Sequence, residues 1–230
     1  MDFETNFKKP FTDVKKLLIG ILLSIVPVVN FLAVGYMLET ARKSMKKDTS
    51  LPEWEGWSDL FVKGLLSIVI EAIYFIPAAI VGLIFMWPVM IKAMPMMMAG
   101  QIPNIGEMIA GMGSMMMGLG LAALLALFAA YIAPSAIFHF LNGTFADAFK
   151  FGDVLKKAFS GTYGMAWTLF ILYSMVLVSV LGFIPYVGSG AATFIAGITG
   201  FSLMGEAFSG SSEAKAVKAM PEKAVKKKRK

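Results

Sequence analysis

The distribution of basic residues along this chain restricts its topology more than any other feature. Four long apolar stretches, residues 64–91, 108–133, 164–183 and 190–208, divide the Lys and Arg residues into groups. At a rise of about 1.5 Å per residue, each stretch is about long enough to cross a hydrocarbon core of about 30 Å. If all four cross, every one of the 21 Lys and Arg residues except Lys92 faces one compartment. Cytoplasmic loops carry the excess of Lys and Arg, so this compartment is predicted to be the cytoplasm.

The composition indicates the same class of protein. Hydrophobic residues make up 57% of the chain and charged residues only 16%, whereas a soluble domain carries about 25% charged residues. The surplus apolar surface must face lipid, which predicts an all-α polytopic bundle in a single domain, residues 1–208. The chain has no cysteine, which excludes disulfides, thiolate nucleophiles and Cys-ligated metal sites.

The net charge of +6 belongs to a basic tail, residues 209–230, which holds seven Lys and one Arg against two Glu. The rest of the chain is neutral, so no nucleic-acid-binding face is expected. The tail is predicted to lie in the cytoplasm, where its last five residues either contact anionic lipid headgroups or only fix the topology. These residues are Lys226, Lys227, Lys228, Arg229 and Lys230.

Residues 14–44 form a fifth apolar region with a different problem. If they crossed once, the four basic residues between positions 42 and 47 would lie outside. Pro27 interrupts a helix, so it can form the turn of a hairpin whose two ends are both cytoplasmic. Each arm reaches only about 20 Å, so the hairpin is predicted to re-enter, or to cross with snorkelling Lys side chains. With the four spans, this gives about six helices in a multi-pass protein of the cell membrane, with both termini cytoplasmic.

The connections carry further expectations. Residues 51–63 are predicted to form an interfacial segment, in which Trp54 and Trp57 anchor at the headgroup level. Residues 92–107, which are rich in Pro and Gly, are expected to form the outer loop. Pro134 is expected to end the span that begins at residue 108.

Three segments of this region occur together in a known family. They are Lys15-Lys16-Leu17-Leu18-Ile19-Gly20, then Pro27-Val28-Val29-Asn30-Phe31-Leu32-Ala33-Val34-Gly35-Tyr36, then Leu51-Pro52-Glu53-Trp54. Together they resemble the prokaryotic, mainly archaeal membrane-protein family known as domain of unknown function 4013. The resemblance implies a polytopic membrane protein and assigns no activity or functional residue.

Four ionisable residues lie in or near the apolar stretches. Glu71 lies roughly 10–16 Å deep in the first span, where an ionisable group costs at least about 2.5 kcal/mol and normally faces a partner or water. Glu71 is therefore a carboxylate that binds a proton or cation, a protonated group between helices, or a shallow residue that reaches the cytoplasmic interface. Glu39, Glu206 and His139 could ring a vestibule beside it, or they are ordinary interfacial charges.

A stripe of small residues recurs every four positions along the span 108–133. Such a stripe lets another helix approach closely, so it is predicted to be a packing face, within the chain or in a homo-oligomer. Its members are Ala110, Ser114, Gly118, Ala122, Ala126 and Ala130.

Methionines recur at the same interval on both sides of the expected outer loop. Thioethers are soft ligands that suit Cu(I), although methionine is also a flexible filler of irregular packing. The row before the loop includes Met90, Met94 and Met98, and the row after it includes Met108, Met112 and Met116.

The sequence offers no enzymatic signature, since it has no glycine-rich phosphate loop, His-Glu-x-x-His motif or Gly-x-Ser-x-Gly elbow. A single His also limits acid–base schemes and His-rich metal sites. We therefore expect a non-enzyme without a cofactor, whose partner is the lipid bilayer. It is a transporter- or channel-like module, a structural or lipid-interacting protein that assembles through the small-residue stripe, or a Met-rich Cu(I)-binding protein.

Overall fold

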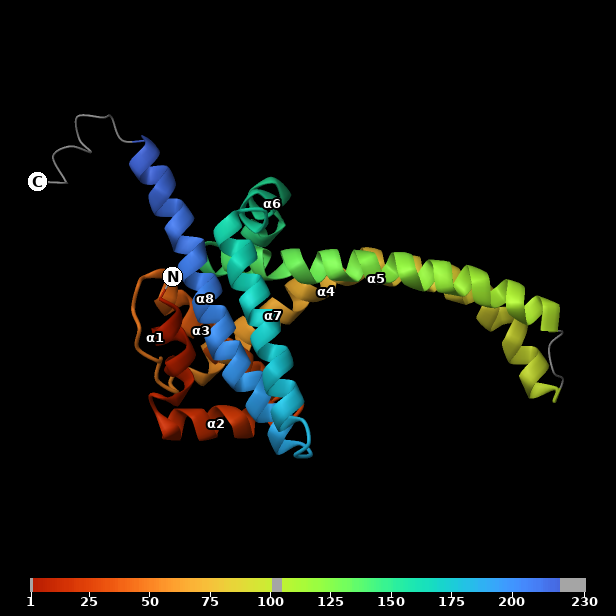
Figure 1. Cartoon of the computed structure of the whole chain (residues 1–230), viewed down its shortest axis with the longest axis horizontal. Coiled ribbons are helices and arrows are strands. Elements are labelled where there is room, and N and C mark those ends of the chain that lie inside the picture. Colours follow the sequence, from red (N-terminus) through yellow and green to blue (C-terminus); the bar gives the residue numbers. More distant parts are fainter. Residues whose placement is uncertain (1, 101–104, 220–230) are drawn as a thin grey trace, which may run out of the picture. The chain divides into compact units, whose positions relative to one another are not determined.

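The computed structural model describes residues 2–100 and 105–219 (Figure 1). The chain divides into two compact units. Unit 1 combines the residues up to Ile68 with those from Ser135 onward, and unit 2 comprises Val69–Pro134. Each unit is described separately below.

The all-α class is confirmed, but the expectation of about six helices is wrong, because the described residues form eight α-helices and two 3-10 helices. The two extra α-helices, α1 and α6, are short and polar, and so lack the long apolar run that marks a span. The elements are α1 (Phe3–Lys8), η1 (Lys9–Phe11), α2 (Val14–Ile25), α3 (Asn30–Met45), α4 (Trp57–Met98), α5 (Ile105–Asn142), η2 (Phe145–Phe149), α6 (Phe151–Ala158), α7 (Gly161–Leu181) and α8 (Val187–Ala219).

Four helices are long and apolar enough to cross a membrane. The qualifying segments are Trp57–Ile91 in α4, Met112–Asn142 in α5, Gly161–Leu181 in α7 and Val187–Ser209 in α8. Lipid can accept such helices because each one satisfies its own backbone hydrogen bonds. The chain is therefore an integral membrane protein.

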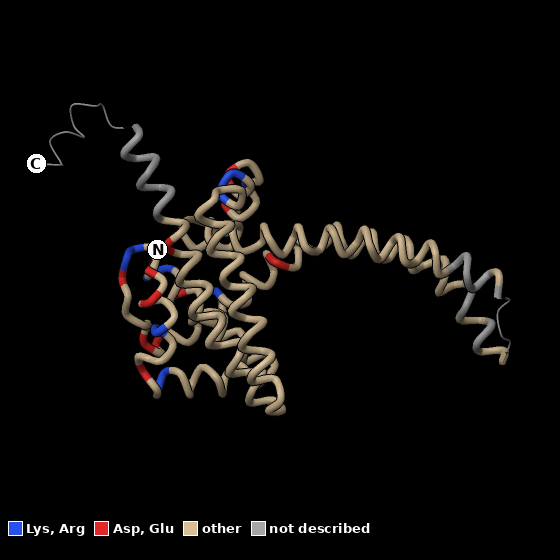
Figure 2. Tube along the Cα trace, viewed as in Figure 1, with Lys and Arg blue, Asp and Glu red and all other residues tan. Residues whose placement is uncertain are grey.

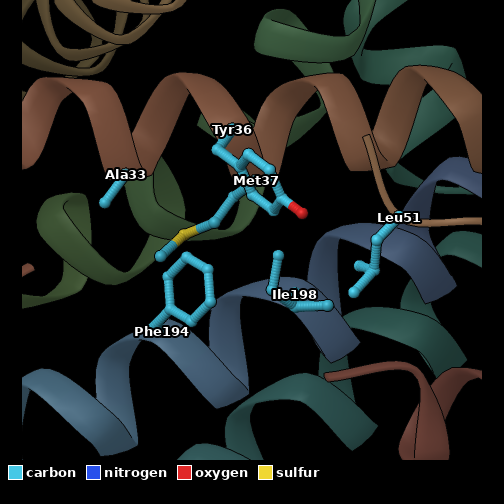
Figure 3. Close-up of a cluster of buried hydrophobic side chains, with 6 residues drawn as sticks. All are labelled: Ala33, Tyr36, Met37, Leu51, Phe194 and Ile198. Carbon is cyan, nitrogen blue, oxygen red and sulfur yellow. The ribbon is translucent and has the colours of Figure 1, made fainter. Parts of the chain in front are cut away.

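Helix α8 is the central element of unit 1. Of its most apolar stretch of 18 residues, 72% are buried, whereas only 6% of the corresponding stretch in α7 are buried. It packs along α7 and α3, and α2 lies across its first turns (Figure 1). Figure 3 shows the resulting core, in which side chains from α3 and α8 meet Leu51 of the following loop. The core residues are Ala33, Tyr36, Met37, Leu51, Phe194 and Ile198.

The helical structure is interrupted between α2 and α3 by a turn at residues 26–29, which contains Pro27. Val28 has a φ of 69°, a region that disfavours β-branched residues and costs of order 1–3 kcal/mol. The turn is held from one side, where Ile25 packs against Gly190 at the start of α8. Helix α2 has only 12 residues, so it is about 18 Å long and cannot cross a hydrocarbon core alone.

In unit 2 the helices α4 and α5 pair through small residues. A Cβ atom placed on Gly118 would lie 2.1 Å from Cβ of Phe85, and one on Gly82 would lie 3.7 Å from Cβ of Ala122. This close approach is the kind that a stripe of small residues permits. Part of the stripe therefore packs within the chain.

The expected outer loop at residues 92–107 is largely helical, which corrects that prediction. Helix α4 continues through Pro88 and Pro95 to Met98, and α5 begins at Ile105. Each proline removes one backbone donor, but the neighbouring turns keep theirs. In an apolar segment the helix remains the conformation that satisfies the most backbone groups.

Pro134 does not end α5, which continues to Asn142. The turns after the proline bury Ser135, Ile137 and Phe138 within unit 1. The Ser135 hydroxyl also donates a hydrogen bond of 3.0 Å to the Val154 carbonyl. A proline inside a helix costs about 3 kcal/mol, and burying two large apolar side chains returns about 3–6 kcal/mol, so packing outweighs the local rule.

Candidate functional site

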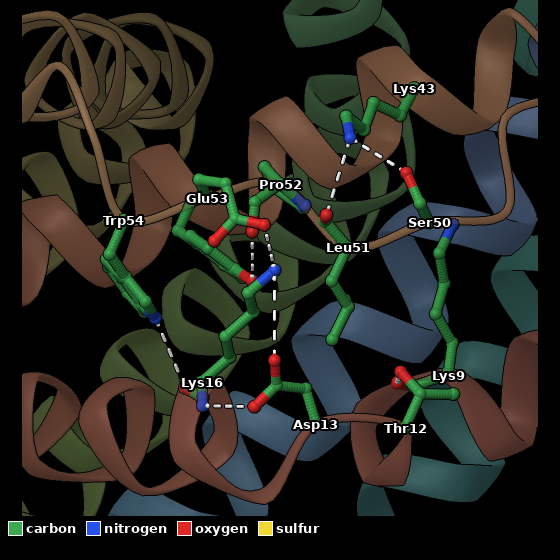
Figure 4. Close-up of polar contacts among 11 residues, drawn as sticks. Lys9, Thr12, Asp13, Lys16, Lys43, Ser50, Leu51, Pro52, Glu53 and Trp54 are labelled. Atoms are coloured by element: carbon green, nitrogen blue, oxygen red, sulfur yellow. Dashed lines mark hydrogen bonds and ion pairs between the residues drawn. The ribbon is translucent and has the colours of Figure 1, made fainter.

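Unit 1 brings the three segments of the family resemblance together at one place. Figure 4 shows Asp13, Lys16, Glu53 and Trp54 there, and Tyr36 stacks on Trp54. We call these five residues the Trp54 junction. Asp13 caps α2 by accepting a hydrogen bond of 3.0 Å from the Lys16 backbone N–H. The Lys16 ammonium then lies 2.6 Å from Glu53 Oε1 and 3.8 Å from Asp13 Oδ2. The Lys16 side chain thus connects Asp13, the N-cap of α2, with Glu53 of the loop.

Aromatic stacking forms the other half of the junction. The rings of Trp54 and Tyr36 lie 4.0 Å apart and are nearly parallel, and Phe194 of α8 lies behind them. Trp54 Nε1 donates to the Lys16 carbonyl at 3.3 Å, and the Tyr36 hydroxyl donates to the Pro52 carbonyl at 2.9 Å. Both aromatic residues therefore bury their apolar bodies and still pair their polar atoms.

The loop between α3 and α4 is held at its beginning by Lys43. Its ammonium donates to Ser50 Oγ at 2.8 Å and to the Leu51 carbonyl at 3.3 Å, and lies 3.6 Å from Asp48. The Ser50 backbone N–H donates to Asp48 at 2.9 Å, and this hydrogen bond lowers the pKa of the Asp48 carboxyl. Together with the Trp54 junction, these contacts fix both ends of the loop.

A second polar cluster involves Glu206 of α8 and Lys9 of η1. The buried Lys9 ammonium donates to Ser44 Oγ at 2.8 Å. Glu206 accepts hydrogen bonds from Asn6 Nδ2 at 2.8 Å and from the Asp2 backbone N–H at 3.0 Å. These contacts connect α1, η1 and α3 to α8.

Lys9 is buried, and desolvation lowers the pKa of its ammonium to about 8 from 10.5, although Glu206 and Asp48 oppose the shift and Lys43 adds to it. At 1.36 kcal/mol per pKa unit, protonated Lys9 costs the fold about 3 kcal/mol below pH 8. Between pH 8 and 10.5 the unfolded chain binds more protons than the folded one, so the free energy of unfolding rises with pH.

We expect Lys9→Met to raise the free energy of unfolding at pH 7 by about 2 kcal/mol, because the variant also gives up a hydrogen bond worth about 1 kcal/mol. At pH 10.5 the gain should disappear. Tryptophan fluorescence during thermal unfolding in detergent at both pH values measures this, with the exposed Lys8→Met as control. A lower stability of Lys9→Met at pH 7 would contradict the prediction.

Lys157 of α6 is the second buried cation. Its ammonium donates to the carbonyls of Ala207 and Phe208, both at 2.7 Å, and lies 4.7 Å from the centre of the Phe208 ring. His139 contacts the same ring edge-on at 5.0 Å, and its Nδ1 lies 2.8 Å from the Ser135 carbonyl. The arrangement ties α5 and α6 to α8.

Three of the four ionisable residues singled out in the sequence, Glu39, Glu206 and His139, lie in unit 1, and the fourth, Glu71, lies in unit 2. Glu206 lies on α8 and bonds to Asn6, and His139 of α5 contacts Phe208, two residues further along α8. Glu39 instead lies 2.9 Å from the Lys63 ammonium and 3.9 Å from Arg42. Glu71 lies in unit 2 with its side chain exposed.

The methionine rows are not enclosed. Met90, Met94, Met98, Met112 and Met116 are exposed, from 48% to 85%. The side chains of Met108 and Ala110 lie outside the described residues. Within the described part of the chain, no group of three or more His, Asp or Glu side chains could hold a metal ion.

The remaining candidates lie in different surroundings. Trp54 packs inside the junction, whereas Trp57 stacks on it at 5.8 Å and is 46% exposed. In the small-residue stripe, Ser114 is exposed and Ala122, Ala126 and Ala130 are partly buried. The five basic residues at the end of the tail lie outside the described residues.

Among the residues whose burial is described, sequence reasoning missed two buried lysines, Lys9 and Lys157, and the aromatic partners Tyr36 and Phe194. A signal existed for Lys157, because it falls three residues after Val154, on the buried face of an amphipathic helix. Lys9 gives no such signal, since its partners come from distant helices.

Comparison with known proteins identifies the family and no relative of known function. No curated protein and no solved structure matches the chain significantly. One family model matches residues 18–186, well over half of the chain, and this match includes the loop of the Trp54 junction. The resemblance seen in the three segments is thereby confirmed: the chain belongs to the family described as "Protein of unknown function (DUF4013)".

Proposed function

We propose that this protein is a non-enzymatic, lipid-interacting structural protein of the cell membrane, with both termini in the cytoplasm. The contrast between its interior and its surface carries the proposal. Inside unit 1, the ionisable side chains at the Trp54 junction and around Lys9 and Lys157 bond to other groups of the chain. On the outside, α4, α5 and α7 present apolar surfaces, with 6% to 17% of their most apolar windows buried.

The proposal assigns an anionic-lipid contact to the basic tail. Changing the five terminal residues, Lys226–Lys230, to Gln removes five positive charges. Each cation near an anionic surface contributes about 1 kcal/mol, so we expect binding of phosphatidylglycerol by the full chain to weaken at least tenfold. Native mass spectrometry of the purified protein with phosphatidylglycerol and phosphatidylcholine measures it.

Lys8→Gln is the matched control, because Lys8 is exposed and already paired with Glu4 at 2.6 Å. Binding of phosphatidylcholine should stay the same in all three proteins. Equal phosphatidylglycerol binding by the parent and the tail variant would refute the proposed contact.

A transporter- or channel-like function is the second candidate, and Glu71 favours it. Its exposed carboxyl group lies on α4 between apolar residues, where a membrane protein normally provides a partner or water. If Glu71 conducts protons, liposomes that contain the protein should dissipate a pH gradient faster than empty ones. Glu71→Gln should abolish that difference, whereas Glu55→Gln, in the loop before α4, should not. Equal rates with and without protein would remove this candidate for protons.

A further inference from the structure

The loop between α3 and α4 lies beside the middle of α8, not beside its end. Leu51 packs against Ile198, close to the centre of the expected span 190–208. Trp54 packs against Phe194, four residues nearer the α7–α8 turn. The loop backbone is not helical over residues 48–56. Irregular backbone at membrane depth occurs only where protein or water covers it, so lipid cannot surround α8 on this side.

Charges extend along the same side of unit 1. The segment that bonds to Glu206 through Asp2 and Asn6 also carries Glu4 and Lys8, whose side chains are 77% and 72% exposed. Near Phe194 the charges include Glu53, 66% exposed, and Asp13. The interval from Phe194 to Glu206 is 12 residues, or about 18 Å of helix. Figure 2 shows charged residues along α1, the loop and the start of α2, while α7 and the α7–α8 turn carry none. We call this side the charged flank.

The opposite arrangement is found at the α7–α8 turn. Phe183 and Tyr186 are 86% and 80% exposed, and Ile184 and Val187 are also exposed. A turn that emerges into water on the far side of a membrane would not be expected to present such a concentration of large apolar groups.

Helix α2 extends this apolar end. Ile25 packs against Gly190 just after the turn, and α2 exposes an apolar stripe at intervals of four residues. The stripe consists of Val14, Leu18, Leu22 and Val26, and exposed Val28 follows it. We call the turn, the stripe and the outer surface of α7 together the apolar side of unit 1.

We propose that unit 1 is embedded in the cytoplasmic leaflet only, with its apolar side in the acyl chains and its charged flank in water. The occupant of the apolar side is thus the lipid of one leaflet, and the α4–α5 hairpin is the element that crosses. If the α7–α8 hairpin turns back within the leaflet, both of its ends lie on the cytoplasmic side. The same is true if the hairpin crosses the bilayer twice. The charge bias of the sequence is therefore the same for both arrangements. The proposal stands independently of the function proposed above.

The absence of native cysteine allows a direct test in intact cells. Three full-length single-cysteine variants are labelled with a membrane-impermeant maleimide before and after permeabilisation: Ala99→Cys near the tip of the hairpin, Tyr186→Cys in the α7–α8 turn, and Lys46→Cys in the loop. We expect Ala99→Cys to react in intact cells, and Lys46→Cys only after permeabilisation. Tyr186→Cys should not react in intact cells, and all three should react in detergent.

A buried cysteine could be unreactive for reasons of depth alone, so a fourth variant carries Ser-Gly-Cys-Gly-Ser inserted after Phe183. The polar insertion brings its cysteine to the nearest aqueous phase. In a single-leaflet unit it reacts only after permeabilisation. Reaction of this variant in intact cells to the same extent as Ala99→Cys would overturn the proposal, as would failure of Ala99→Cys to react from outside. Tryptophan fluorescence melting confirms that each variant is folded.

Discussion

Gly35→Ala is expected to destabilise unit 1 by more than about 3 kcal/mol, enough to leave little folded protein in detergent. The added Cβ would lie 1.9 Å from the Leu60 carbonyl oxygen and 2.6 Å from its carbon. The crossing is reciprocal, because a Cβ on Gly64 would lie 2.0 Å from the Phe31 carbonyl oxygen. At both positions the obstacle is backbone, so no side-chain rotation can relieve the clash. The helices α3 and α4 would have to separate.

Gly152→Ala provides the matched control, since it adds the same methyl group to helix α6 at a point where no atom beyond the adjacent residues and the helix's own backbone lies within 4 Å of it. This variant should be unchanged or gain up to about 1 kcal/mol from helix propensity. The yield of monodisperse protein and the melting midpoint from tryptophan fluorescence measure both effects. A Gly35→Ala protein with the midpoint of the parent would show that the two helices do not cross at this distance.

Apolar length predicted the helices of this protein well, and local rules about proline predicted their ends poorly. The stretches at 164–183 and 190–208 became α7 and α8 because an apolar segment of about 20 residues has few alternatives to a helix. Pro95 and Pro134 were expected to mark non-helical chain or a helix end, yet both lie inside helices. Burial of Ile137 and Phe138 offsets the cost of Pro134, and this burial depends on contacts that no local pattern contains.

The candidate site shows a similar division. The three segments around the Trp54 junction could be picked out from the sequence, but their meeting place could not, because Trp54 contacts Phe194, which is 140 positions away. Trp near an apolar run also predicts an interfacial anchor, and only the fold distinguishes that position from the packed one. Lys9 and Lys157 resemble snorkelling lysines in sequence, whereas their burial requires acceptors from α3 and α8.

Trp54→Ala is expected to lower the free energy of unfolding by about 3–4 kcal/mol. Removing a large packed aromatic side chain typically costs 3–5 kcal/mol, and Trp54 is only partly buried. The variant loses its stacking on Tyr36 and the hydrogen bond from Nε1 to the Lys16 carbonyl. It should also loosen the loop, so limited proteolysis after Lys46 and Lys47 should become faster.

Two further variants separate the contributions to this effect. Trp54→Phe keeps an aromatic ring on Tyr36 and removes the Nε1 donor. It should therefore lose no more than half of the stability that Trp54→Ala loses. Trp57→Ala removes a Trp that is 46% exposed, so it should cost less than about 1 kcal/mol. If Trp54 were an anchor in the headgroups, the two alanine variants would instead behave alike, and both would lose membrane affinity with little change in melting. A large difference in melting midpoint between Trp54→Ala and Trp57→Ala therefore indicates a packed junction. Two Trp residues that only anchored in the headgroups would contribute about equally to stability.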